Sequence, residues 1–306
     1  MAAATVGIAP EPEAGDHGGV TWIDFESGTP SPRPIDTSWI HGSPSAKHNT
    51  DPDIQVVEYD QHTIILRQNM AINYEAPFLF LIFGNTRAVL LDTGATESAE
   101  YFPLRRSVDS LLRKWLAVNP RDDYGLLVLH THAHADHVAA DGQFFGRSNT
   151  EIVDAPTAYA HFGFDTGPDS LVLVDLGGRV LELLATPGHH STAITVYDPY
   201  DGLLLTGDTV YPGRLYVEDW PAFVRTIDRL IDFATDRPVV NILGCHIEMT
   251  STPGVDYPVR TTYQPDEPSL QMTVDQLKDI GSALNQIGGL PGRYPFSDFV
   301  ICVDRS

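Results

Sequence analysis

The stretch from Thr131 to His137 reads Thr-His-Ala-His-Ala-Asp-His, so three histidines and one aspartate fall within six consecutive residues. It follows the apolar run Gly-Leu-Leu-Val-Leu at 125–129, which is typical of a buried strand. A single hydrated side chain at the end of a core strand would more often be an ordinary core or surface residue. Four of them in this spacing predict a site for zinc or a similar divalent ion.

Three further polar side chains follow apolar runs later in the chain. His189 ends the segment Ala-Thr-Pro-Gly-His, Asp208 ends Leu-Thr-Gly-Asp, and His246 ends Leu-Gly-Cys-His. The glycine in each segment lets the backbone turn tightly, so that side chains at several strand ends face one cleft. One such turn is weak evidence. Three of them in order after the His-rich stretch strengthen the prediction of a metal site.

The pattern of apolar runs from residue 51 to residue 306 predicts one α/β domain. Short β-branched or apolar runs begin at Ile54 and recur as far as Val303. Apolar residues at helical spacing predict helices over 108–116, over 220–231 and around 270–287. Two successive strand–helix halves favour two sheets packed face to face with helices outside, which is a four-layer αββα sandwich.

Residues 1–50 are rich in Pro, Gly, Ser and acidic residues and predict an extended N-terminal arm. Aromatic residues such as Trp39 indicate that parts of the arm dock, either on their own domain or on a partner subunit in a homodimer. The N-terminus does not fit a signal peptide, and no apolar run is long enough to span a bilayer. Together with the two isolated cysteines, Cys245 and Cys302, these features predict a cytoplasmic protein without a membrane partner.

The charge balance restricts the partners of the protein. Its 306 residues include 19 Lys and Arg against 41 Asp and Glu, for a net charge of −22. A surface this acidic repels phosphate backbones and disfavours a nucleic-acid partner. A small molecule is therefore the expected substrate.

Five short motifs together resemble the metallo-β-lactamase superfamily. In chain order they are Leu-Asp-Thr-Gly at 91–94, His-x-His-x-Asp-His at 132–137, Thr-Pro-Gly-His at 186–189, Thr-Gly-Asp-Thr at 206–209 and Gly-Cys-His at 244–246. The resemblance covers roughly residues 54 to 250 of the chain. It is specific for the αββα fold and for metal binding, and much less specific for the substrate.

The resemblance implies two metal positions that share one carboxylate. The implied ligands are His132, His134 and His189 for the first metal, Asp136, His137 and His246 for the second, and Asp208 as the bridge. Two zinc ions are the expected cofactors, and manganese or iron are the alternatives that His and Asp ligands also accept. Asp92 would lie behind the ligands and accept a hydrogen bond from a ligand or a loop amide. An aspartate that caps the turn before Gly94 explains the local sequence equally well.

Such a site implies hydrolysis without a covalent intermediate. Two cations lower the pKa of a water molecule between them, and the resulting bridging hydroxide attacks a carbonyl carbon. Asp136 and Asp208 are the carboxylates expected to handle the proton. Tyr211, three residues after Asp208, matches a tyrosine that lactonases of the superfamily often carry, and it would donate a hydrogen bond to the oxyanion. The alternative for Tyr211 is ordinary packing.

Departures from the family pattern narrow the expected substrate to a small ester, lactone or thioester. No lysine falls between Lys114 and Lys278 to hold a β-lactam carboxylate, and residues 251–306 carry few basic side chains for a glutathione moiety. Arg214 and Arg260 are candidates for holding a substrate carboxylate, unless they form surface ion pairs. The alternative activity is that of a mononuclear iron persulfide-dioxygenase-like oxidoreductase of the same fold, because such enzymes retain similar residues.

Overall fold

The computed structural model describes residues 21–28, 30, 33–164 and 170–304. Its first sheet has six strands in the order β1 to β6. Neighbouring strands are antiparallel from β1 to β4 and parallel from β4 through β5 to β6. The strands are β1 (Ile54–Glu58), β2 (Thr63–Gln68), β3 (Phe78–Phe83), β4 (Arg87–Leu91), β5 (Gly125–Leu129) and β6 (Thr150–Ile152).

A second six-stranded sheet has the order β13-β12-β10-β9-β8-β7. Its strands are β7 (Leu171–Asp175), β8 (Val180–Ala185), β9 (Ile194–Asp198), β10 (Leu203–Gly207), β12 (Asn241–Gly244) and β13 (Gln271–Met272). β10 and β12 are parallel, and the other neighbours are antiparallel. A third sheet joins β11 (Arg214–Val217) to β15 (Val300–Val303) and β14 (Gly292–Pro295).

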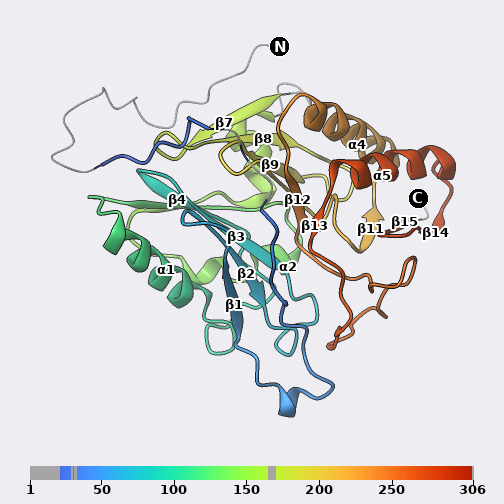
Figure 1. The fold of residues 1–306 in the computed structure, drawn as a ribbon, viewed down its shortest axis with the longest axis horizontal. Helices are drawn as coiled ribbons and strands as arrows, with labels where there is room; N and C mark the ends of the chain where they lie inside the picture. The colour runs from blue at the N-terminus through green and yellow to red at the C-terminus, as the bar shows by residue number, and fades with distance from the viewer. Residues whose placement is uncertain (1–20, 29, 31–32, 165–169, 305–306) are drawn as a thin grey trace.

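The two large sheets pack face to face, and helices cover their outer faces (Figure 1). Every side chain of β3 is buried, because both faces of this sheet are covered. Alternate residues point to opposite faces, so Phe80 enters the core between the sheets and Leu79 enters the core under α1 (Leu104–Val118). α4 (Trp220–Thr235) and α5 (Val274–Ile287) pack on the second sheet. The predicted four-layer αββα sandwich is confirmed.

The remaining helical segments are short. They are α2 (Ala135–Val138), α3 (Ala158–Phe162) and the 3-10 turns η1 (Ala46–His48), η2 (Asp141–Gln143) and η3 (Ala155–Thr157). None of the helices in the described part of the chain has the length and apolarity needed to cross a bilayer.

The sequence pattern misplaced one helix start and did not reveal the third sheet. Helix α5 begins at Val274 and not near residue 270, because residues 271–272 pair with β12 and Thr273 caps the helix. Thr273 accepts a bond from the Gln276 amide, and the Gln276 side chain accepts one from the Thr273 amide. In the third sheet, the exposed strand β14 lacks the apolar alternation that would identify it.

The described part of the arm packs on its own chain. Trp39 packs edge-on against Phe78 with 4.8 Å between ring centroids, in the core between the two sheets. Phe25 lies edge-on to the His62 ring at 5.3 Å. Gly42 forms an isolated bridge with Tyr263, which ties the arm to the loop after β12. The domain boundary near residue 50, and a homodimer through the arm, stay predictions.

Candidate metal centre

The predicted ligands all follow strand ends of the two large sheets. β5 leads into the turn that carries the His-rich stretch, and in the second sheet His189 follows β8, Asp208 follows β10 and His246 follows β12. β10 and β12 are parallel, so their carboxyl ends share one edge of the second sheet. β4 and β5 are parallel in the first sheet, so Asp92 and the His-rich turn also share an edge. The packing of the two sheets brings both edges together.

Two glycines permit the close approach that the ligands need. Gly207 has a φ of +54°, and a Cβ there would lie 2.6 Å from the Cβ of Thr131. Gly188 has a φ of +138°, and a Cβ there would lie 2.4 Å from the backbone of Phe223 in α4. Any other residue would therefore push Asp208 or His189 out of place.

His132, His134 and His189 form a first group, whose ligand atoms lie within 4.8 Å of one another. The Nε2 atoms of His132 and His189 lie 2.9 and 3.2 Å from Nδ1 of His134. His189 donates its Nδ1–H to the Tyr216 carbonyl at 2.9 Å, which leaves the lone pair of Nε2 facing the group. Three converging imidazole nitrogens match the nitrogen ligands of a zinc site.

Asp136, His137, Asp208 and His246 form a second group within the same limit. The Nε2 atom of His246 lies 3.4 Å from Asp136 Oδ2 and 3.4 Å from Asp208 Oδ1. His137 Nε2 lies 3.4 Å from Asp136 Oδ2 and 3.5 Å from Asp208 Oδ2. His246 donates its Nδ1–H to the Glu75 carbonyl at 2.9 Å, so its Nε2 is also free to bind a cation.

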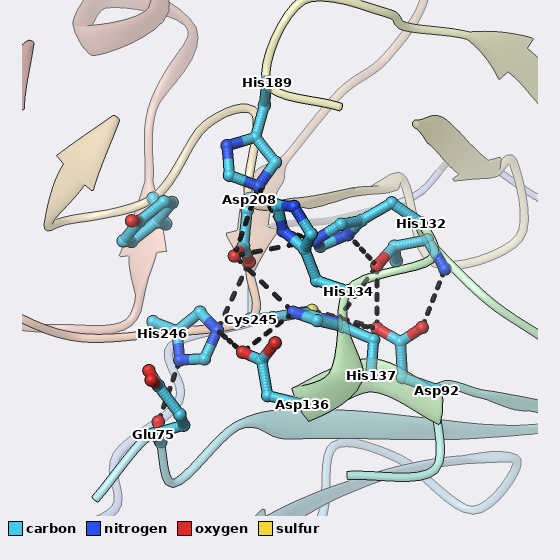
Figure 2. Close-up of polar contacts among 12 residues, drawn as sticks. Glu75, Asp92, His132, His134, Asp136, His137, His189, Asp208, Cys245 and His246 are labelled. Carbon is cyan, nitrogen blue, oxygen red and sulfur yellow. Dashed lines mark hydrogen bonds and ion pairs between the residues drawn. The ribbon is translucent and has the colours of Figure 1, made fainter. Parts of the chain in front are cut away.

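Asp208 lies between the first group and the other members of the second group: in Figure 2, His189 lies above its carboxylate, and His246 and Asp136 lie below it. Its Oδ2 atom is 3.9 Å from His132 Nε2 and 3.8 Å from His189 Nε2. Two buried atoms at this centre, His137 Nε2 and Asp208 Oδ1, have no hydrogen-bond partner among the described residues. Burying such atoms unpaired is costly, and a divalent cation would satisfy both. The residues therefore fit the two metal positions that the resemblance implies.

Asp92 lies fully buried behind the second group (Figure 2). It accepts hydrogen bonds from the Thr131 amide at 2.7 Å, from the Thr131 hydroxyl at 2.8 Å and from His137 Nδ1 at 2.9 Å. The Cys245 thiol donates to it at 3.3 Å. Its φ of +67° is a left-handed conformation that the surrounding contacts must hold in place. Asp92 thus contacts both a proposed ligand and a loop amide.

The charges of the site are strongly coupled. Burial alone would raise the pKa of Asp208, but His246 and His137 hold it well below its ordinary value. Burial alone would lower the pKa of His246, but Asp208 and Asp136 hold it well above its ordinary value. For His132, burial lowers the pKa well below the usual range and His137 adds to the effect. A bound cation would compete with protons for these atoms.

Solvent reaches the site past two of its members. The side chain of His134 is 36% exposed and that of Asp136 is 21% exposed, whereas those of His132, His137, His189 and His246 are at most 5% exposed. His134 and Asp136 therefore form the solvent-facing side of the site.

Two predicted substrate contacts have other partners. The Tyr211 hydroxyl donates to the Arg214 carbonyl and lies 3.2 Å from Glu248 Oε2, so a role as oxyanion donor stays a prediction. The Arg214 guanidinium is buried and pairs with Glu248 and with Asp256, so it is not free for a substrate carboxylate. Arg260 is exposed.

Two features near the site escaped the sequence reasoning. His130 bridges the Val153 carbonyl at 3.0 Å and Asp141 Oδ1 at 2.8 Å, which ties the end of β5 to η2. His190 lies outside the predicted ligand set, yet its ring centroid lies 4.7 Å from that of His134. The His-His doublet at 189–190 was the one signal for this second ring.

Comparison with known proteins finds one matching family and several similar enzymes. The sequence model of the family described as "Metallo-beta-lactamase superfamily" matches residues 76–282 of this chain. The hydroxyacylglutathione hydrolase of Rhizobium meliloti is 27% identical over 188 residues, which cover 57% of this chain and 70% of that protein. The acyl-coenzyme A thioesterase MBLAC2 of Bos taurus is 28% identical over 204 residues, which cover 55% of this chain and 72% of that protein.

A solved structure supports the fold alone. The metallo beta lactamase from Erythrobacter litoralis superposes with a TM-score of 0.51 at 14% identity, covering 78% of this chain and 99% of that chain. Its likeness and the family match agree with the observed αββα layers. Because the family match spans more than half of the sequence, the chain belongs to the metallo-beta-lactamase superfamily.

Proposed function

We propose that the protein is a metal-dependent hydrolase that cleaves a small ester, lactone or thioester. The observation that carries this proposal is the pair of ligand groups joined by Asp208, where the buried atoms His137 Nε2 and Asp208 Oδ1 have no hydrogen-bond partner among the described residues. A structural zinc site is usually closed and four-coordinate, often with cysteine ligands. This site is open on the side of His134 and Asp136, as a catalytic site requires.

The first group would hold one divalent cation and the second group the other, with zinc the expected ion and Asp208 the bridge. When bound, the two cations would supply an activated water molecule and a Lewis acid for the carbonyl oxygen. The residues behind the ligands set ring orientation: Tyr216 and Glu75 accept Nδ1–H bonds through their carbonyls, and Asp92 does so through its carboxylate.

Asp136 is the carboxylate we assign to proton transfer with solvent. Its side chain is 21% exposed, while that of Asp208 is 9% exposed and lies among imidazoles. In the reaction, a water oxygen bonds to the carbonyl carbon and the bond from that carbon to the leaving oxygen or sulfur breaks. Asp136 takes the proton that the water loses and passes it to the leaving oxygen or sulfur as the bond breaks, and the carboxylic acid product releases its own proton to solvent.

The named relatives favour a thioester among the three substrate classes. Both the hydroxyacylglutathione hydrolase and the acyl-coenzyme A thioesterase have names that describe thioester cleavage. Residues 251–306 of this chain carry four basic residues, Arg260, Lys278, Arg293 and Arg305, and among them Arg293 pairs with Asp256. Few cationic side chains are therefore present in this segment to bind carboxylates of a substrate. A thioester with a compact or apolar acyl group suits this chain better than a substrate that carries many carboxylates.

The decisive experiment pairs metal analysis with turnover. Protein as isolated should contain about two equivalents of zinc per chain, and it should hydrolyse at least one compound in a set of acyl thioesters, aryl esters and lactones. His134→Ala should lose metal from the first group and abolish hydrolysis. The exposed His48 lies outside the site, so His48→Ala should retain both metals and full activity.

The same experiment tests the alternative activity. One iron per chain, no hydrolysis, and oxygen consumption with a persulfide would replace the hydrolase proposal with the oxidoreductase. The complete second group of Asp136, His137, Asp208 and His246 is the observation that favours two metals.

A further inference from the structure

A histidine that lies outside both ligand groups stands at the open side of the site. The ring centroid of His190 is 4.7 Å from that of His134 and 5.7 Å from that of His132. His134 is the most exposed ring of the first group, and its Nε2 atom lies 3.6 Å from the half-exposed Glu218 carboxylate. His190 is itself partly exposed. It therefore borders the path by which a substrate reaches the first metal position.

The hydrogen bonds of His190 fix which of its nitrogens carries the hydrogen. The Thr192 backbone amide donates to His190 Nδ1 at 3.1 Å, and the Thr192 hydroxyl lies 2.9 Å from the same atom. An amide N–H can only donate, so Nδ1 must be the bare, accepting nitrogen of a neutral ring. The hydrogen is then on Nε2, which forms no hydrogen bond with a described residue.

We propose that His190 Nε2–H is a hydrogen-bond donor to the substrate oxyanion at the first metal position. This inference rests on the proposed function and deepens it. A fixed, neutral donor at the edge of a partly buried site stabilises negative charge as it develops, and no proton has to be transferred. The ring keeps its hydrogen throughout the reaction, and Thr192 holds it in the donating tautomer.

His190 is better placed for this role than Tyr211. The Tyr211 hydroxyl is buried and already donates to the Arg214 carbonyl, so using it elsewhere would leave that carbonyl unpaired. The Nε2–H of His190 has no such bond to a described residue that it would have to give up. The ring of His134, whose centroid is 4.7 Å away, limits the space around His190, which would orient a bound oxyanion.

The first test is the tautomer in the zinc-loaded protein, measured by ¹⁵N NMR with labelled histidine. His190 should carry its hydrogen on Nε2, and a hydrogen on Nδ1 would overturn the inference. The second test is the affinity for inorganic phosphate, a tetrahedral oxyanion, measured by calorimetry. His190→Phe removes the donor and His190→Gln offers a side-chain amide in its place.

We expect His190→Phe to weaken phosphate binding roughly 10- to 100-fold with metal content unchanged, because a hydrogen bond to a charged group is lost. His190→Gln should recover much of that affinity. Wild-type affinity in His190→Phe, or a loss seen in Tyr211→Phe alone, would overturn the assignment. If the wild type binds zinc and phosphate but hydrolyses no ester, lactone or thioester, the proposed reaction fails while the phosphate comparison still decides the role of His190.

Discussion

At the scale of single residues, Asp92 connects the loops that hold the two ligand groups. Its carboxylate accepts from Thr131, which precedes His132 of the first group, and from His137 of the second group. It also accepts from Cys245, which precedes His246. One buried carboxylate thus contacts His137 itself and the residues directly before His132 and His246, and so holds three proposed ligands in position. Its left-handed backbone, with a φ of +67°, is the strain expected at a functional position.

Replacing Asp92 by Asn tests this role without a backbone change, because Asn tolerates the left-handed conformation. The Asn side-chain NH2 would face donors such as His137 Nδ1–H, so the His137 ring would lose the carboxylate oxygen that accepts its hydrogen bond and fixes its orientation. We expect metal affinity at the second group to fall about 10- to 100-fold, measured by titration against a competing chelator. The exposed Asp228 on α4 provides the matched control, and Asp228→Asn should bind metal normally. Unchanged affinity in Asp92→Asn would show that Asp92 only caps its turn.

At the scale of elements, the turn between β8 and β9, which packs against the start of α4, depends on Gly188. Its carbonyl accepts from the amides of Glu218 and Asp219 at 2.9 and 3.0 Å, directly before α4 begins. Asp219 caps that helix by accepting from the Ala222 amide. The helix start and the turn that carries His189 are therefore one packed unit.

Gly188→Ala should disrupt this unit, because the new Cβ would lie 2.4 Å from the Phe223 backbone. We expect the free energy of unfolding to fall by ~1–3 kcal/mol, as in other overpacked sites, and binding of the first metal to weaken. The comparison is Gly142→Ala, where a Cβ meets no atom within 4 Å and the backbone is not left-handed. Urea unfolding of the metal-free proteins measures the difference. Equal stability of the two variants would contradict the close packing at Gly188.

Sequence patterns predicted the elements that have a strong period or a motif. β3 is a continuous apolar run, β2 and β4 each contain a shorter one, and α1 and α4 have apolar residues at helical spacing, so both sheets and their helices were predicted. The exposed strand β14 and the two-residue strand β13 have no such pattern, because their pairing depends on partners far along the chain.

The same limit applies to the candidate site. Its ligand types and their order were visible because glycine turns and apolar runs flank them in sequence. The contacts of Tyr211, Arg214 and His190 were not, because each depends on residues that the fold brings alongside. Glu248, for example, is 34 residues from Arg214 in the chain, yet the two side chains form an ion pair.

At the scale of the whole molecule, a buried charge cluster joins the two sheets at the end opposite the metal centre. Arg179 pairs with Asp198 and, at 2.8 Å, with Asp201, which precedes β10, whereas Asp208 follows β10. Asp201 also accepts from the Thr63 hydroxyl of β2 at 2.6 Å, so the cluster spans both sheets. Two buried carboxylates share one guanidinium there.

This cluster predicts a pH-dependent stability. Burial raises the pKa of Asp201 to about 6. The positive charge of Arg179 opposes this increase, and the negative charge of Asp198 adds to it. Between the ordinary pKa of 3.8 and about 6, the folded chain holds a proton that the unfolded chain has released. The contribution of this proton to stability is therefore complete below the ordinary pKa and is lost as the pH rises through about 6.

Asp201→Asn removes this titration, so the stability of the variant relative to the wild type should improve as the pH rises from 4 to 7, by up to ~3 kcal/mol. Urea unfolding of both proteins at each pH, with a chelator present, excludes any contribution from metal binding. Asp228→Asn, at an exposed position on α4, should show no such trend. A stability difference between Asp201→Asn and wild type that is constant with pH would show that Asp201 stays charged beside Arg179. The two sheets would then be joined by an ion pair at every pH in this range.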